Sequence, residues 1–128
     1  MRLFWEKGYD TVGVAELSQS IGVNPPSLYA AYGSKRALFL RALEHYAGTQ
    51  AQFFGRLKDA DGPAFETLVA VLEAAALSCT ADRTARGCLV MDSTRNCADP
   101  EARALTANIR ADVRENARRL IARDRPEA

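Results

Sequence analysis

Apolar residues recur along this chain at spacings of three and four, which is the period of an amphipathic α-helix. No run alternates apolar and polar residues as a half-buried strand does. The one Asp-Gly pair, Asp61-Gly62, is followed by Pro63 and lacks flanking strands, so it does not indicate a hairpin. The pattern therefore predicts an all-α protein, with short helices first and longer ones after them.

The first third of the chain is divided by residues typical of helix ends. Gly8, Gly22 and Gly33 each follow an apolar stretch, where a glycine commonly ends a helix. Asn24 and Ser34 are good N-caps, and a proline directly after Asn24 is favourable at a first helical position. We predict a helix that ends at Gly8, two short helices over 14–21 and 25–32, and a longer helix from Ser34 to about residue 47.

The two short helices have the layout of a helix-turn-helix. Such a motif needs a tight turn between helices that cross steeply, and Gly22 supplies the positive φ of that turn. Ser18 is small where the helices would approach closely. Apolar side chains are expected to fill the wedge between the helices: Leu17, Ile21, Val23 and Leu28. The second helix would then present its N-terminal residues to the major groove of DNA.

The remainder of the chain contains two strong helix signals. Residues 48–63 hold several breaks, and residues 64–79 form an amphipathic pattern whose apolar positions we interpret mainly as core: Phe65, Leu68, Val69 and Leu72. A polar loop is expected over 82–87 and a short apolar segment, helical or extended, over 87–91. Asp99 and Pro100 begin a last helix that we expect to reach about residue 123.

Particular residue types at fixed spacings in the first 38 residues resemble those of a known protein family. They are Leu3-Phe4, Gly8-Tyr9, Thr11, Val14, Leu17, Ile21-Gly22-Val23, Ser27-Leu28-Tyr29, Tyr32, Ser34-Lys35 and Leu38. This run resembles the DNA-binding domain of the TetR family of transcriptional regulators. The resemblance implies a three-helix DNA-binding head at 1–47 whose first helix is incomplete. It also implies a helical ligand-binding and dimerisation region at 48–128, itself incomplete, in which Gly87–Val90 is similar to a segment common in part of the family.

The resemblance also implies a DNA-binding role for nine residues. Their positions match Thr11, Gly13, Asn24, Pro25, Pro26, Ser27, Tyr29, Tyr32 and Lys35. The segment 24–27 would lie near bases and phosphates, and Tyr29 and Tyr32 would contact the DNA backbone through their hydroxyls. Lys35 would bind phosphate, which physical chemistry favours independently, because free N–H groups and the helix dipole attract an anion at a helix start. Partial core burial of the tyrosines and a solvated Lys35 remain the alternatives.

A ligand cavity between the later helices is a second candidate site. Residues that could line it are Phe65, Val69, Leu72 and Cys88. The three cysteines are interpreted mainly as small buried residues. The alternative is that Cys88 is reactive and senses oxidants or electrophiles. His45 is interpreted as a surface or hinge residue and not as a metal ligand.

Composition narrows the function further. The net charge of +1 excludes a polybasic tail, no apolar stretch approaches the length of a bilayer span, and three cysteines without a CxxC pair favour a reducing, cytoplasmic location. Motifs for nucleotide binding, hydrolysis or metal binding are absent, so we expect no enzyme, cofactor or metal.

The sequence thus predicts a ligand-responsive repressor of the TetR type. Its expected partners are double-stranded operator DNA and an unidentified small-molecule effector, with a homodimer as a further candidate and no membrane. Two alternatives stay open: a truncated, non-functional regulator fragment, and a helical module that binds ligands or proteins but not DNA.

Overall fold

The computed structural model describes residues 1–125, and all regular elements in that range are helices, with no strand. Its elements are α1 (Arg2–Lys7), α2 (Val14–Ile21), α3 (Pro25–Tyr32), α4 (Lys35–Gly48), the 3-10 helix η1 (Gln52–Gly55), α5 (Arg56–Asp59), α6 (Ala64–Ala81), α7 (Leu89–Asp92) and α8 (Pro100–Asp124). The predicted all-α class is confirmed. The last three residues of the predicted second region, 126–128, lie outside the described residues.

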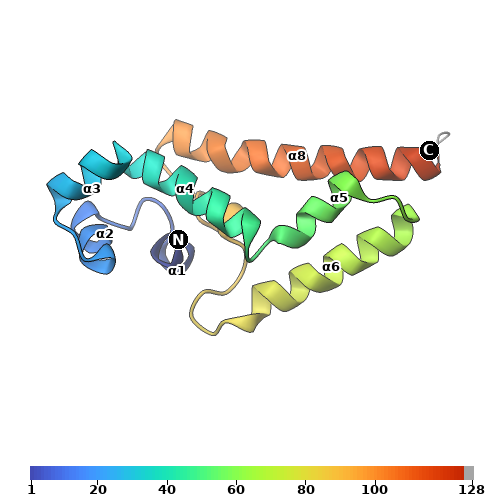
Figure 1. Ribbon diagram of the computed structural model, residues 1–128, viewed down its shortest axis with the longest axis horizontal. Helices are drawn as coiled ribbons and strands as arrows, with labels where there is room; N and C mark the ends of the chain where they lie inside the picture. The colour runs from blue at the N-terminus through green and yellow to red at the C-terminus, as the bar shows by residue number, and fades with distance from the viewer. Residues whose placement is uncertain (126–128) are drawn as a thin grey trace.

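The helices form an elongated molecule with α2 and α3 at one end (Figure 1). Helix α8 runs along most of its length, beginning beside α4 and ending near the turn that leads into α6. Helix α6 runs back in the opposite direction, and the Ala64 N–H donates a hydrogen bond to the Asp124 carboxylate where the two helices meet. The long helix therefore connects the end that carries α3 to the opposite end of the protein.

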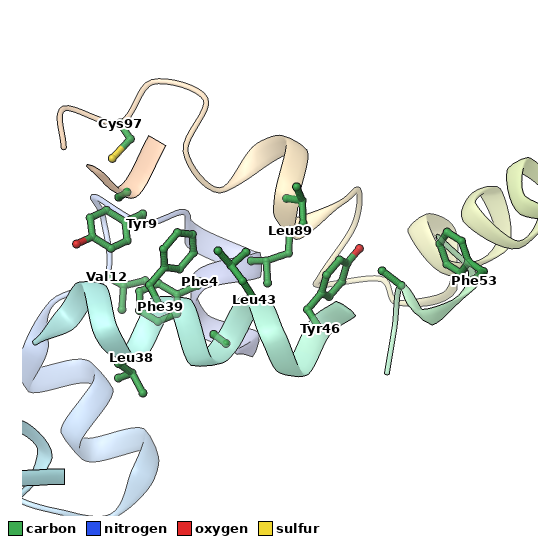
Figure 2. Close-up of a cluster of buried hydrophobic side chains, with 14 of the residues drawn as sticks. Phe4, Tyr9, Val12, Leu38, Phe39, Leu43, Tyr46, Phe53, Leu89 and Cys97 are labelled. Atoms are coloured by element: carbon green, nitrogen blue, oxygen red, sulfur yellow. The ribbon is translucent and has the colours of Figure 1, made fainter. Parts of the chain in front are cut away.

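The core is densest along α4, which lies against α1 and α7 (Figure 2). Phe4, Phe39 and Leu43 have no exposed surface. The Phe39 ring meets the Phe4 ring edge-on at a centroid distance of 5.0 Å and the Tyr9 ring at 4.9 Å. These contacts bury large apolar areas in favourable aromatic geometry and fix α4 relative to α1.

The predicted helix limits at the N-terminal end are confirmed. The Asn24 side chain accepts a hydrogen bond from the Ser27 N–H at 2.9 Å, and the Ser34 hydroxyl accepts one from the Ala37 N–H at 3.0 Å. The Asp99 cap at the start of α8 is also confirmed, with its carboxylate accepting from the Glu101 and Ala102 N–H groups. Two elements were missed: η1 and α5 form within 48–63, where glycines and a proline predicted only breaks.

Two sets of predicted core residues are wrong in part. Phe65, Val69 and Leu72 are 78%, 37% and 67% exposed, and only Leu68 of the predicted set packs against the core. Helix α6 packs through the stripe that contains Ala64, Leu68, Val71 and Ala75, which is rotated from the predicted stripe. In the helix-turn-helix, Leu17 and Leu28 fill the wedge as expected, each only 4% exposed. Ile21 and Val23 remain 46% and 39% exposed, because they flank the turn at Gly22 and α2 packs mainly against α3.

We expect Phe39→Ala to lower the free energy of unfolding by about 3–5 kcal/mol, because it empties the centre of the aromatic cluster. Leu40→Ala is the matched control. Leu40 is the next residue along α4 and is 39% exposed, so its truncation should lower the free energy of unfolding much less. Urea unfolding followed by circular dichroism measures both. Equal losses for the two variants would contradict the assignment of this core.

Candidate nucleic-acid interface

Helices α2 and α3 are joined by a turn that depends on Gly22. This residue has φ 82° and ψ 26°, the left-handed conformation that glycine adopts without strain. The N–H groups of Gly22 and Val23 both donate to the Ser18 carbonyl, at 2.9 and 3.0 Å, which ends α2 and redirects the chain. Asn24 then caps α3 at once, so the two helices form the predicted helix-turn-helix.

Helix α3 is held to the protein by very little of its own surface. Leu28 is its only buried residue, and the other seven positions of this eight-residue helix are exposed. Tyr29 and Tyr32 are 45% and 38% exposed. A helix of this kind, rigidly capped but free on most of its circumference, can enter a DNA groove without rearrangement.

The predicted DNA-contacting residues are accessible. All are exposed except Lys35, which is half-buried: Thr11, Gly13, Asn24, Pro25, Pro26, Ser27, Tyr29, Tyr32 and Lys35. Residues 24–27 form the start of α3, Gly13 caps α2, and Thr11 lies just before it. Their individual contacts with DNA remain predictions.

Lys35 is the first residue of α4, and its ammonium lies 4.5 Å from the centroid of the Tyr9 ring. This cation–π contact holds the charge beside the free N–H groups of the helix start. An ammonium, a helix dipole and unpaired N–H donors all attract an anion, so the start of α4 is suited to a phosphate.

The other cations of residues 1–47 are engaged in ion pairs. Arg2 binds Glu6 and Asp82, Lys7 binds Glu16, Arg36 binds Asp99 and Glu101, and Arg41 binds Glu44. Within the described residues, Lys35 is the cation of this region that has no carboxylate partner. The surface around α3 therefore offers hydroxyl and N–H donors together with a single free positive charge.

A polar cluster connects this region to α8. The Arg36 guanidinium lies 3.0 Å from the Asp99 carboxylate, and the Tyr9 hydroxyl donates to the same carboxylate at 3.2 Å. Asp10 accepts from the Ala98 N–H at 2.8 Å and from the Cys97 thiol at 3.1 Å. We call these residues the α4–α8 junction: Tyr9, Asp10, Arg36, Cys97 and Asp99.

The junction shifts the titration of its own groups. Burial, followed by the nearby Asp99 charge, raises the pKa of Tyr9 to about 12. Burial opposes ionisation of Asp99, but the Ala102 N–H and the Arg36 guanidinium outweigh it and hold the pKa of that carboxyl below its usual value. The Ala98 N–H and the Cys97 thiol likewise lower the pKa of Asp10.

Sequence reasoning missed this junction. It identified Asp99 only as a helix cap and gave no role to Arg36, which lies 63 residues away in the chain. Arg36 directly follows Lys35 at a helix start, where solvated arginines are common, so nothing in the local sequence indicated an ion-pair partner. Only the fold brings these partners together.

The candidate ligand-pocket residues are not gathered into one cavity. Phe65, Val69 and Leu72 lie on the exposed side of α6, whereas Cys88 precedes α7 and its sulfur accepts a hydrogen bond from the Tyr46 hydroxyl at 3.5 Å. Cys97 is buried, as predicted, while Cys79 and Cys88 are half-buried. His45 is exposed near the end of α4, and no cluster of metal-ligating side chains forms within residues 1–125.

Comparison with known proteins gives a consistent family assignment. Residues 1–42 match the family model described as bacterial regulatory proteins, tetR family. The HTH-type transcriptional repressor BdcR of Escherichia coli is 39% identical over 125 residues, covering 98% of this chain and 63% of the relative. The repressor ComR of the same species is 32% identical over 99 residues, covering 73% of this chain and 45% of the relative.

A solved structure agrees with these relatives. It is a cysteine mutant of the TetR family transcriptional regulator CifR complexed with 26-bp double-strand operator DNA. The match has a TM-score of 0.74 and 34% identity, and it covers 94% of this chain and 66% of that one. The chain thus spans less than two thirds of the length of BdcR and about two thirds of the CifR chain.

We expect Asp99→Asn to lower the melting temperature at pH 7 and to matter less in acid. A carboxyl with a lowered folded-state pKa stabilises the protein above its unfolded pKa of about 3.9, and this contribution disappears as the pH falls through the folded value. Asparagine keeps the helix cap but loses the charge that Arg36 binds. Thermal unfolding between pH 7 and pH 3 measures the gap between variant and wild type.

Asp112→Asn is the matched control, because Asp112 is an exposed carboxylate of the same helix without an ion pair in the described range. Its effect should be small at every pH. A gap between wild type and Asp99→Asn that stays constant from pH 7 to pH 3 would contradict the role given to the Asp99 charge.

Proposed function

The chain belongs to the TetR family of bacterial regulatory proteins, and from this premise we propose that it is a DNA-binding transcriptional repressor whose residues 1–47 read operator DNA. The observation that carries the proposal is the exposure of α3, which is rigidly capped yet buried only through Leu28. The named relatives are transcription regulators, which supports a regulatory role over an enzymatic one.

In the proposed complex α3 enters the major groove. Its exposed residues are proline, serine, alanine and tyrosine, which lack the bidentate amide and guanidinium groups that most often read base edges. Ser27 offers one hydroxyl near the helix start, and the alanines offer small apolar contacts to thymine methyl groups. We therefore infer that shape and backbone contacts contribute a large share of the affinity.

Phosphates flanking the groove would be held mainly by neutral donors. The hydroxyls of Tyr29, Tyr32 and Thr11 are exposed around α3, and the start of α4 adds N–H groups and the Lys35 ammonium. A backbone phosphate accepts hydrogen bonds from all of these groups. Each DNA-binding head would contribute one unpaired cation, Lys35, to phosphate binding. Few counterions would therefore be released from the DNA when the protein binds.

Regulation is the remaining part of the proposal. A small-molecule effector would bind residues 48–128 more tightly in one arrangement of the helices, and this would shift the orientation of the DNA-reading region. The α4–α8 junction directly connects the two regions and could transmit such a change. Pairing of two copies would place two heads on adjacent half-sites. A cytoplasmic location follows from a function on DNA.

An electrophoretic mobility shift with DNA from upstream of the gene tests the proposal. We expect binding at micromolar protein or below, competed by unlabelled fragment more strongly than by unrelated DNA. A protein that retains its helix content by circular dichroism but gives no shift at these concentrations would contradict DNA binding. That result would favour a helical ligand-binding or protein-binding module.

The charge arrangement makes a quantitative prediction for Lys35→Ala. The logarithm of the binding constant should fall with the logarithm of salt concentration at a shallow slope, about −1 per bound head. Removing the Lys35 ammonium should weaken binding and flatten the slope by about 0.9 per head. Titrations from 50 to 200 mM salt by fluorescence anisotropy give both quantities.

Lys58→Ala is the control for this experiment. Lys58 is an exposed lysine of α5, and its loss changes the net charge equally without touching the region around α3. A wild-type slope several times steeper, unchanged by Lys35→Ala, would show that the paired arginines leave their carboxylates to bind DNA. The proposed dominance of neutral donors would then be wrong.

A further inference from the structure

The two long helices differ in charge. Helix α6 contains no lysine or arginine, and with a mean hydropathy of 1.5 it is long and apolar enough by length and composition to cross a membrane, which the sequence pattern did not indicate. Helix α8 is rich in arginine. Arg119 and Arg123 form ion pairs, whereas Arg103 and Arg110 have no carboxylate partner within residues 1–125.

These two unpaired arginines border a recess on the first half of α8. The recess has a volume of about 390 Å³, and Arg95 of the connection between α7 and α8 also lines it. No carboxylate of the described residues lines it. We call it the α7–α8 recess. Like charges around one hollow concentrate a positive potential inside it, so the recess attracts anions.

The side of the recess next to α7 is held in place by hydrogen bonds. The hydroxyls of Thr94 and Thr106 lie 2.6 Å apart in a hydrogen bond, and both residues are buried. Arg110 donates from Nη1 to the Val90 carbonyl at 3.0 Å, which fixes its guanidinium beside α7. Because a guanidinium has five N–H donors, Arg110 keeps others for a ligand. A site ordered in advance loses little entropy when it binds.

The other two guanidiniums are available as well. Neither a hydrogen bond nor an ion pair engages the side chain of Arg103 within residues 1–125. Arg95 binds the Asp92 carboxylate at 2.7 Å, but its side chain is 70% exposed. An exposed ion pair of this kind contributes little, so a ligand with several negative charges can compete for Arg95.

The spacing along α8 indicates the shape of the ligand. Arg103 and Arg110 are seven residues apart, which is about 10 Å along the helix axis. This separation suits a molecule whose anionic groups are several bonds apart better than one compact ion. Ala104 and Ala107 lie between the arginines and leave room close to the helix, and Met91, which is 54% exposed, offers apolar contact to a carbon skeleton.

We propose that the α7–α8 recess binds a small organic polyanion that carries two or three carboxylate or phosphate groups on a short carbon skeleton. Arg103 and Arg110 bind its two ends, and Arg95 binds a further anionic group. Guanidinium groups bind carboxylate and phosphate through paired, charge-assisted hydrogen bonds. The Arg103 N–H donates to the Asp99 carbonyl at 3.1 Å, so the bound anion lies one helical turn from the residue that binds Arg36.

The shape of the recess favours a small molecule over a DNA backbone as the occupant. Small-molecule sites are concave, whereas a duplex presents its phosphates on a convex surface. Arg110 is half-buried and bonded to Val90, so it cannot extend toward a large ligand outside the recess. Helix α3, the proposed DNA-reading helix, lies at the end of the molecule beyond the start of α8 (Figure 1).

Isothermal titration calorimetry at constant ionic strength tests the proposal. Citrate and 3-phosphoglycerate are the probes with separated anionic groups, inorganic phosphate is the compact probe, and acetate is the probe with a single charge. We expect citrate and 3-phosphoglycerate to bind with dissociation constants of about 1 mM or below, at least about tenfold tighter than acetate and tighter than phosphate. The tighter of the two identifies the ligand as a polycarboxylate or a phosphorylated acid.

Variants assign the binding to the recess. Arg103→Gln with Arg110→Gln should weaken citrate binding at least about tenfold, because two charge-assisted contacts are lost. Arg114→Gln with Arg118→Gln is the matched control, since it removes the same charge from exposed, unpaired arginines further along α8 and should bind citrate like the wild type. Ala107→Glu places a carboxylate between Arg103 and Arg110 and should abolish binding, which gives a second test if the first variant loses helix content.

Several outcomes would overturn the proposal. They are citrate binding no tighter than acetate binding, phosphate binding tighter than citrate binding, equal weakening by the two double variants, and citrate binding that survives Ala107→Glu. Loss of duplex DNA binding by Arg103→Gln with Arg110→Gln in the absence of citrate would assign these arginines to a DNA surface instead. Because the calorimetry contains no DNA, its failure is distinct from failure of the proposed function.

Discussion

The burial of Leu28 is the contact on which the proposed DNA-reading surface depends. An eight-residue helix has too little circumference both to pack extensively and to offer a face to DNA, and α3 packs through this one leucine against the wedge that holds Leu17. Capping by Asn24 and the left-handed turn at Gly22 then supply the rigidity that packing does not. The helix is thus fixed in place while most of its surface stays available.

We call residues 1–47, the proposed DNA-reading region, the reading end. The reading end is almost neutral, whereas the α4–α8 junction that connects it to α8 is built around charged residues. The other lysines and arginines of residues 1–47 bind carboxylates, so Lys35 alone offers an unpaired side-chain cation there among the described residues. Arg36, the next residue, is directed to Asp99 at the start of α8. Two neighbouring residues at one helix start therefore serve different purposes: one is suited to an anion, and the other ties the reading end to a helix that runs along most of the molecule.

Local rules predicted the reading end well and the rest less well. Glycines, caps and prolines act within a few residues, so the limits of α2, α3 and α4 and the cap of α8 followed from the sequence. The rotation of α6 did not, because Phe65 and Ala64 both fit a helical stripe and only packing against α5 and α8 selects between them. The ion pair of Arg36 with Asp99 joins residues that no local pattern relates, and the contacts of the nine candidate residues with DNA stay predictions.

In the proposed function, α3 and the start of α4 form the surface that binds duplex DNA. The most direct test is an NMR titration of the isotopically labelled chain with duplex DNA from upstream of its gene, following each backbone amide. We expect the largest shifts at residues 24–36 and near Thr11, with α6 and the second half of α8 nearly unchanged. Shifts concentrated on the arginines of α8, with α3 unaffected, would contradict it.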